Sequence, residues 1–106
     1  MQANYNIIYY PIAYTDISEI LDYITNTFNA QQTANKLLEK FKNSIANLAS
    51  FPFSGTELEL VNEDLQSKYR WIKVDNYTVF YTVNKDTYTV SIMRILYGAS
   101  DFLSKL

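Results

Sequence analysis

The chain has 106 residues, of which 48% are hydrophobic, and a formal net charge of −2. This length predicts one domain, spanning residues 1–106, with enough apolar content for a packed core. The absence of Cys excludes disulfides and thiolate chemistry, and the absence of His excludes histidine catalysis and most zinc sites. We therefore expect no cofactor, and any catalysis would have to use Lys, Arg, Tyr or carboxylates. With no long apolar run and no secretory leader, we expect a cytoplasmic protein.

The charge is distributed unevenly along the chain. Residues 1–68 carry four Lys against eight Asp and Glu, whereas residues 69–106 carry five Lys and Arg against three Asp. The C-terminal third is therefore the basic part of an acidic protein. That balance is compatible with a local phosphate-binding surface, although five cations are few for a nucleic-acid binder.

The N-terminal region predicts a strand followed by a helix. Residues 5–10 (YNIIYY) are rich in β-forming residues. Pro11 closes this strand and suits the first turn of a helix. Apolar residues then recur at helical spacing over residues 12–28. The acidic residues of this helix are predicted on its outer side, and they are Asp16, Glu19 and Asp22.

A second amphipathic helix follows after a short connection. Its apolar stripe runs from residue 34 to residue 48, and Asn29 is predicted to cap it. Because the connection is short, the two helices are predicted to pack as an antiparallel hairpin. Residues 51–55 predict a turn, and residues 56–68 predict an acidic loop whose spacing matches no calcium site.

The last third predicts an antiparallel three-strand meander. Between residues 69 and 97, runs of β-branched and aromatic residues are separated by polar breaks at 75–76 and 84–86. Strict alternation in the last strand places Arg94 on the same face as the core residues Val90 and Ile92. The element order β-α-α-β-β-β predicts an α+β fold, with a helical hairpin covering one face of a small, mainly antiparallel sheet.

Four residues of the meander are candidates for chemistry: Arg70, Lys73, Arg94 and Tyr97. A guanidinium on the core face needs a partner, so Arg94 either forms a structural ion pair, with Asp101 nearest downstream, or holds a phosphate. Arg70 and Lys73 have opposite parity, so a regular strand cannot point both at one phosphate. Tyr97 is either a proton donor or base-stacking platform, or a sheet aromatic whose hydroxyl reaches water.

Four stretches of the chain together resemble the RelE/ParE superfamily of toxins from bacterial type II toxin–antitoxin modules. They are residues 11–24, residues 48–55 (LASFPFSG), residues 69–83 (YRWIKVDNYTVFYTV) and residues 92–102 (IMRILYGASDF). The resemblance implies a small toxin held inactive by a cognate antitoxin from a neighbouring reading frame. RelE-like members cleave mRNA in the ribosomal A site, and ParE-like members poison DNA gyrase.

Several positions depart from the pattern of the nuclease members. RelE-type nucleases typically place an Arg where this chain has Thr78. Many relatives follow the glycine of the last strand with two basic residues, where this chain has Ala99 and Ser100. A His is common just before that glycine, where this chain has Tyr97, a residue that some relatives also have. Arg70, Arg94 and Asp101 do match the superfamily pattern.

Three functions remain open from the sequence. The first is a metal-independent endoribonuclease that cuts ribosome-bound mRNA. In it Arg70 and Arg94 neutralise phosphate, Lys73 is a base or clamp, and Tyr97 is an acid or stacking platform. The second is a toxin that inhibits DNA gyrase by binding, and the third is a weakened toxin that keeps only its antitoxin. In every case we expect an antitoxin to dock by helix docking or strand addition, and no membrane partner.

Overall fold

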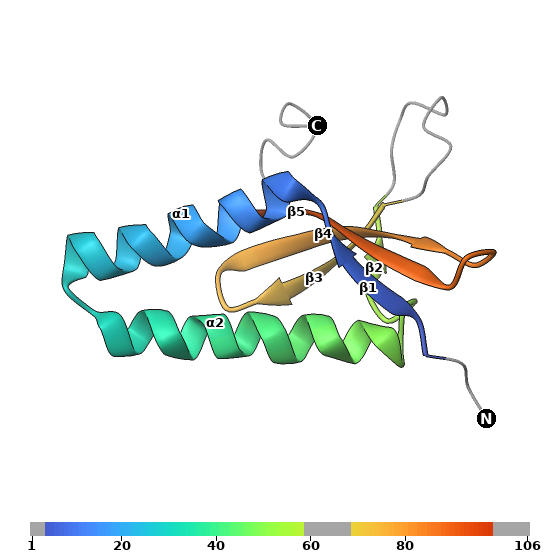
Figure 1. The fold of residues 1–106 in the computed structure, drawn as a ribbon, viewed down its shortest axis with the longest axis horizontal. Coiled ribbons are helices and arrows are strands. Elements are labelled where there is room, and N and C mark those ends of the chain that lie inside the picture. Colours follow the sequence, from blue (N-terminus) through green and yellow to red (C-terminus); the bar gives the residue numbers. More distant parts are fainter. Residues whose placement is uncertain (1–3, 59–68, 99–106) are drawn as a thin grey trace.

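The computed structural model of this protein describes residues 4–58 and 69–98. Within these residues, two helices pack against a five-stranded sheet (Figure 1). The strand order is β1-β5-β4-β3-β2, and only the β1–β5 pair is parallel. The elements are β1 (Asn6–Tyr9), α1 (Pro11–Phe28), α2 (Gln31–Ala46), the 3-10 turn η1 (Asn47–Ala49), β2 (Thr56–Glu57), β3 (Tyr69–Val74), β4 (Tyr77–Asn84) and β5 (Thr89–Tyr97).

This architecture confirms the predicted α+β fold, with a helical hairpin against a small, mainly antiparallel sheet. One difference is β2, because Thr56–Glu57 falls in the predicted loop but pairs antiparallel with β3 at the sheet edge. The rest of that loop, from residue 59 to residue 68, lies outside the described residues. The two-residue turn between β3 and β4 falls at the predicted polar break, with Asp75 at a φ of 54°.

Local backbone chemistry decides where α1 begins and ends. Pro11 lies in its first turn, where the missing N–H breaks no helical hydrogen bond. Asn29 adopts the left-handed conformation, with a φ of 49°, that terminates the helix. The predicted role of Asn29 as a cap of the second helix is therefore wrong, since Ala30 precedes α2 and no side chain caps it. Neither described helix has the length and apolar character needed to cross a membrane.

The apolar stripes of both helices face the sheet, as their spacing predicts. Ala13 of α1 is fully buried, and Leu37, Phe41 and Ile45 of α2 follow one another at intervals of four residues. One hydrophobic cluster joins these helix residues to the sheet. The sheet contributes Val74, Val79, Tyr81, Val90, Ile92 and Ile95 to this cluster.

A bulge in β5 changes which residues share a face. The register against β4 shifts between Phe80 and Tyr81, and Met93 is left without a partner on β4. Strict alternation predicts that Arg94 continues the core face of the strand. That prediction is wrong, because the extra residue gives this place in the main core cluster to Ile95.

The hydroxyl of Tyr81 links the loop that contains Pro52 and Gly55 to the sheet by two hydrogen bonds. It donates a hydrogen bond to the carbonyl oxygen of Pro52 and accepts one from the N–H of Gly55, each 2.9 Å long. A Cβ atom at residue 55 would collide with this hydroxyl and lie 2.8 Å from the carbonyl oxygen of Trp71, so the close approach requires glycine. Burial raises the pKa of Tyr81 above its ordinary value of 10.0.

We expect Tyr81→Phe to lower the free energy of unfolding by about 2 kcal/mol, because it leaves a buried N–H and a buried carbonyl unpaired. Urea denaturation at pH 7 measures this loss. Tyr88→Phe is the matched control. Because Tyr88 is exposed, the free energy of unfolding of this variant should differ from that of the unaltered protein by less than about 0.5 kcal/mol. Equal losses in the two variants would contradict the assigned role of the Tyr81 hydroxyl.

We also expect stability to fall as the pH rises above about 10, the pKa of a tyrosine in an unfolded chain. The pKa values of Tyr9, Tyr77 and Tyr81 are raised in the folded protein, chiefly by burial. As the pH rises, the tyrosines of the unfolded chain therefore lose their protons first. The contribution of these three tyrosines to the free energy of unfolding is complete below pH 10 and is lost as the pH approaches their pKa values in the folded protein. Urea midpoints measured from pH 8 to pH 11 test this, and the fall should be shallower in Tyr81→Phe.

Candidate functional site

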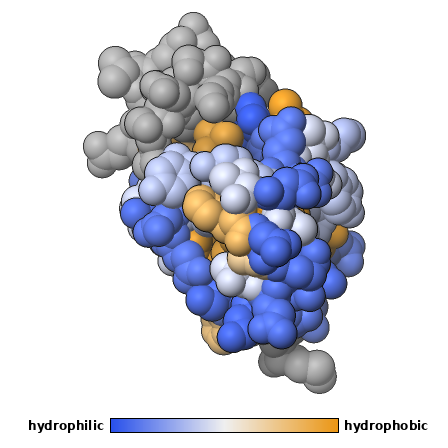
Figure 2. Space-filling model, turned by 90° about the vertical axis from the view of Figure 1, so that its left-hand side faces the viewer, coloured by the Kyte–Doolittle hydropathy of each residue, from blue (hydrophilic) through white to orange (hydrophobic). Residues whose placement is uncertain are grey.

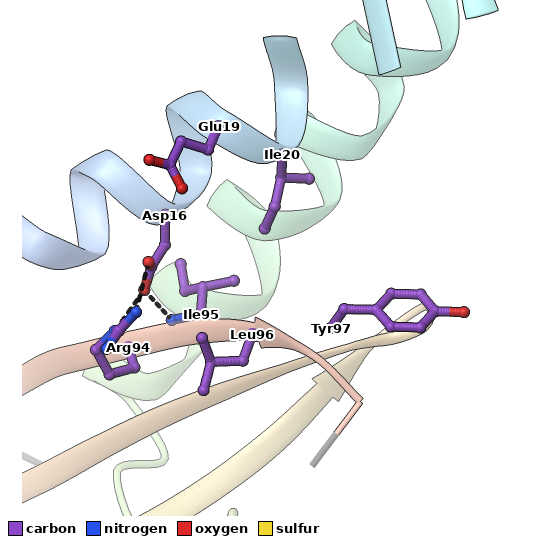
Figure 3. A pocket seen from close by; sticks show the side chains of 7 residues that line it. All are labelled: Asp16, Glu19, Ile20, Arg94, Ile95, Leu96 and Tyr97. Atoms are coloured by element: carbon purple, nitrogen blue, oxygen red, sulfur yellow. Dashed lines mark hydrogen bonds and ion pairs between the residues drawn. The ribbon is translucent and has the colours of Figure 1, made fainter. Parts of the chain in front are cut away.

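Arg94 is held by a carboxylate from α1. Its Nε and Nη2 atoms donate hydrogen bonds of 2.8 and 2.9 Å to the two carboxylate oxygens of Asp16. The same carboxylate accepts the backbone N–H of Ile95 at 3.0 Å. The Arg94 and Asp16 side chains are only 13% and 7% exposed. These contacts tie α1 to β5, and Figure 3 shows them at one end of a pocket.

The electrostatics of this pair limit what Arg94 can do. The hydrogen bonds to Asp16 raise the pKa of Arg94, and the nearby carboxylate of Glu19 acts in the same direction. Arg94 is therefore always a cation, but its charge is matched by Asp16 at bonding distance. A phosphate that used Arg94 would have to compete with a bidentate carboxylate.

Among the described residues, Arg94 forms the predicted structural ion pair, with Asp16 as a partner that the sequence analysis did not propose. The candidate partner Asp101 lies outside the described residues, so that pairing stays a prediction. The prediction that Asp16 lies on the outer side of its helix is wrong, because this residue is buried. The spacing could have predicted this burial, because Asp16 follows Ala13 by three residues and precedes Ile20 by four, which places it on the apolar stripe.

Tyr97 lies in the same pocket as Arg94 and, like Glu19, is exposed there. The side chain is 72% exposed, and its ring meets that of Tyr77 edge-on with centroids 5.6 Å apart. Of the four predicted residues, the structure brings these two, Arg94 and Tyr97, into one pocket, which has a volume of about 230 Å³. The pocket is lined by Asp16, Glu19, Ile20, Arg94, Ile95, Leu96 and Tyr97.

Arg70 and Lys73 lie away from this pocket and from each other. The Nη1 atom of Arg70 donates hydrogen bonds of 2.9 and 3.4 Å to the carbonyl oxygens of Gly55 and Phe53. Arg70 lines a second cavity, of about 700 Å³, together with Lys85. Lys73 is exposed and lines neither cavity. Since the β3–β4 register is unbroken, Arg70 and Lys73 point to opposite faces of the sheet, as predicted.

The described residues thus do not gather the four candidates around one phosphate. Cleavage by a His-free site would need an acid, a base and positive charge within reach of a single reacting group. Arg94 and Tyr97 share a pocket, whereas Arg70 and Lys73 do not join them. The catalytic roles of these four residues stay predictions. Within residues 4–58 and 69–98, no three acidic side chains gather in a way that would hold a metal ion.

The end of α1 exposes two aromatic side chains, and one of them, Phe28, is the last residue of the apolar stripe that was predicted to be buried. Tyr23 and Phe28 are 58% and 63% exposed, and their rings meet edge-on with centroids 5.7 Å apart. Figure 2 views the end of the molecule where the two helices connect, and it shows hydrophobic side chains bordered by hydrophilic ones. Exposed aromatic groups of this kind are typical of surfaces that bind another protein.

Comparison with known proteins identifies the family. A family model described as the ParE toxin of the type II toxin–antitoxin system, parDE, matches residues 7–102. The chain belongs to the ParE toxin family. The resemblance to the RelE/ParE superfamily is thereby confirmed, and the protein is a toxin of a type II toxin–antitoxin system. No match was found among curated proteins.

Two solved toxin–antitoxin structures share this ParE-type fold. The first is a chromosomal ParDE system from P. aeruginosa, with a TM-score of 0.71 and 13% identity over 92% of this chain and 100% of that chain. The second is the RelBE2 toxin–antitoxin complex from Mycobacterium tuberculosis, with a TM-score of 0.56 and 15% identity over 89% of this chain and 98% of that chain. At such identities the likeness shows the fold alone.

We expect Asp16→Ala to lower the free energy of unfolding by about 3 kcal/mol, because it leaves a nearly buried guanidinium and the Ile95 N–H without their acceptor. Urea denaturation measures the loss. Glu19→Ala, at an exposed position one turn further along α1, is the control and should cost less than about 0.5 kcal/mol.

A double variant sharpens this test of the ion pair. Combining Asp16→Leu with Arg94→Met replaces both charges by apolar groups, so the loss in the double variant should be smaller than the sum of the two single losses. Strictly additive losses would contradict a direct coupling between the two side chains.

Proposed function

We propose that this ParE-family toxin acts by binding DNA gyrase and has no nuclease activity of its own. The observation that carries the proposal is the dispersal of the predicted catalytic residues. Arg94 is matched by a carboxylate, Arg70 lines a different cavity, and Lys73 lines neither. Gyrase is the target that the ParE branch implies, and the family match supports that branch.

The central strand gives further support to a binding mechanism. Thr78 occupies the position where RelE-type nucleases typically carry an Arg. It is fully buried, and its hydroxyl has no hydrogen-bond partner among residues 4–58 and 69–98. A buried threonine cannot neutralise a phosphate, so a principal source of positive charge for RNA cleavage is missing at this place.

We also propose that a cognate antitoxin holds the toxin inactive. The two similar structures are a toxin–antitoxin system and a toxin–antitoxin complex, which supports a partner of this kind.

The exposed aromatic rings of Tyr23 and Phe28 provide a protein-binding surface at the tip of the helical hairpin. A toxin that acts by binding would depend on this hairpin rather than on a set of acids and bases.

The first experiment is a supercoiling assay with purified gyrase and relaxed plasmid. We expect the toxin to inhibit supercoiling or to trap cleaved DNA, and we expect the antitoxin to reverse the effect. A paired variant, Tyr23→Ala with Phe28→Ala, should weaken inhibition at least tenfold, because it removes the exposed rings from the hairpin. Lys73→Ala should leave inhibition unchanged, since Lys73 is exposed and lines neither of the two cavities.

Cleavage of ribosome-bound mRNA is the second candidate, because Arg94 and Tyr97 share one pocket. Primer extension on an mRNA translated in a purified cell-free system tests it. New cuts in ribosome-occupied codons that disappear in Lys73→Ala or Tyr97→Phe would overturn the gyrase proposal. Negative results in both assays would leave the weakened toxin, which keeps the fold and its antitoxin.

A further inference from the structure

The cavity that contains Arg70 lies at the end of the sheet where β4 turns into β5. Figure 1 shows this turn at the opposite end of the molecule from the connection between α1 and α2. The cavity shares no lining residue with the pocket of Arg94. Its volume, about 700 Å³, is that of a small-ligand site. It can therefore hold a ligand independently of the exposed rings at the tip of the helical hairpin.

Two cations of this cavity are held against one aromatic ring. The guanidinium carbon of Arg70 lies 5.1 Å from the centre of the Phe53 ring. The Nζ atom of Lys85 lies 5.3 Å from the same point. A positive charge at this range is attracted by the electrons of the ring, so Phe53 supports both side chains. Two like charges are thereby kept close together in one cavity.

The guanidinium of Arg70 keeps its binding side open. Its Nη1 atom donates to the carbonyl oxygens of Phe53 and Gly55, while its Nε and Nη2 atoms make no hydrogen bond with residues 4–58 and 69–98. Nε and Nη2 together form the edge of a guanidinium that binds two oxygens of one anion. In Arg94 the same two atoms bind the two carboxylate oxygens of Asp16. Arg70 therefore presents an open fork where Arg94 presents a filled one.

The acidic residues of the cavity leave these two cations unmatched. Glu57 and Asp86 also line it, so the lining as a whole carries no net charge. Neither of them, however, forms an ion pair with Arg70 or Lys85. Glu57 is engaged in a contact of its own, and Asp86 lies in the exposed turn. The attraction for an anion is therefore local to the ring of Phe53, which predicts weak binding that depends on position.

We infer that this cavity binds a phosphodiester group of a nucleic-acid strand. The open fork of Arg70 takes two phosphate oxygens, and Lys85 supplies a second positive charge. Tyr10 lines the same cavity and is 42% exposed, so its ring can stack on a neighbouring base. The site binds the strand and cuts no bond. DNA held by gyrase and RNA on the ribosome both offer this group, and the site does not depend on the proposed contact between the hairpin tip and gyrase.

Removal of one charge, with a matched control, tests the inference. The probes are a short fluorescent DNA strand and an RNA strand of the same sequence, and anisotropy gives the Kd of each. Lys85→Ala and Lys42→Ala both remove a charge at an exposed position, but only Lys85 lines the cavity. Arg70→Lys keeps the charge and removes the fork. Thermal unfolding of each variant verifies its fold, because Arg70 also holds the loop at Gly55.

We expect a Kd on the order of 10⁻⁴ M for the unaltered toxin at low salt, about fivefold weaker in Lys85→Ala and in Arg70→Lys, and unchanged within about twofold in Lys42→Ala. The slope of log Kd against log salt should be smaller by about 0.7 in Lys85→Ala, the value for one phosphate contact on a single strand. Tighter binding of DNA would assign the phosphate to gyrase-held DNA, and tighter binding of RNA to the ribosome.

Equal losses in Lys85→Ala and Lys42→Ala would overturn the assignment of the cavity. A toxin that inhibits gyrase supercoiling but binds neither strand would overturn this inference and leave the gyrase proposal standing. Conversely, a toxin that binds a strand through Lys85 and Arg70 without inhibiting gyrase would support the cavity and overturn the gyrase proposal.

Discussion

A single carboxylate organises the part of this toxin where helix and sheet meet. Asp16 accepts hydrogen bonds from two nitrogens of Arg94 and from the backbone of Ile95, so it couples α1 to the strand at three points. It neutralises Arg94, the cation of the pocket, and accepts a backbone N–H of β5. The positive charge of Arg94 is therefore matched, so a phosphate would have to compete with a carboxylate for it.

Periodic patterns along the sequence predict most of this fold. The helical stripes, the proline at the start of α1 and the polar break at residue 75 are local signals, because each depends on residues within a few positions of one another. The same holds for the opposite facing of Arg70 and Lys73, which follows from the period of a regular strand. The local pattern did fail for one residue of a regular helix, because Asp16 was predicted on the outer side of α1 and is buried.

The errors arose where distant residues or an irregular backbone decide the outcome. The Asp16–Arg94 pair joins residues 78 positions apart, and no local rule connects them. The sequence could therefore not identify Asp16 as a partner of Arg94, and the Asp101 that it proposed lies outside the described residues. Asn29 carries a side chain that can either cap a following helix or end a preceding one in the left-handed conformation, and here it does the latter. The candidate site could be predicted as a set of residue types, but not as an arrangement.

The bulge at Met93 has a consequence for comparing this toxin with its relatives. The extra residue inverts the facing of every position that follows it in β5, including Tyr97. Consider a relative that lacks the extra residue. In its last strand, a side chain at the same number of residues after the β4–β5 hairpin would point to the opposite face of the sheet. To equate side chains near the end of the strand between this toxin and such a relative, an alignment needs a one-residue gap at Met93.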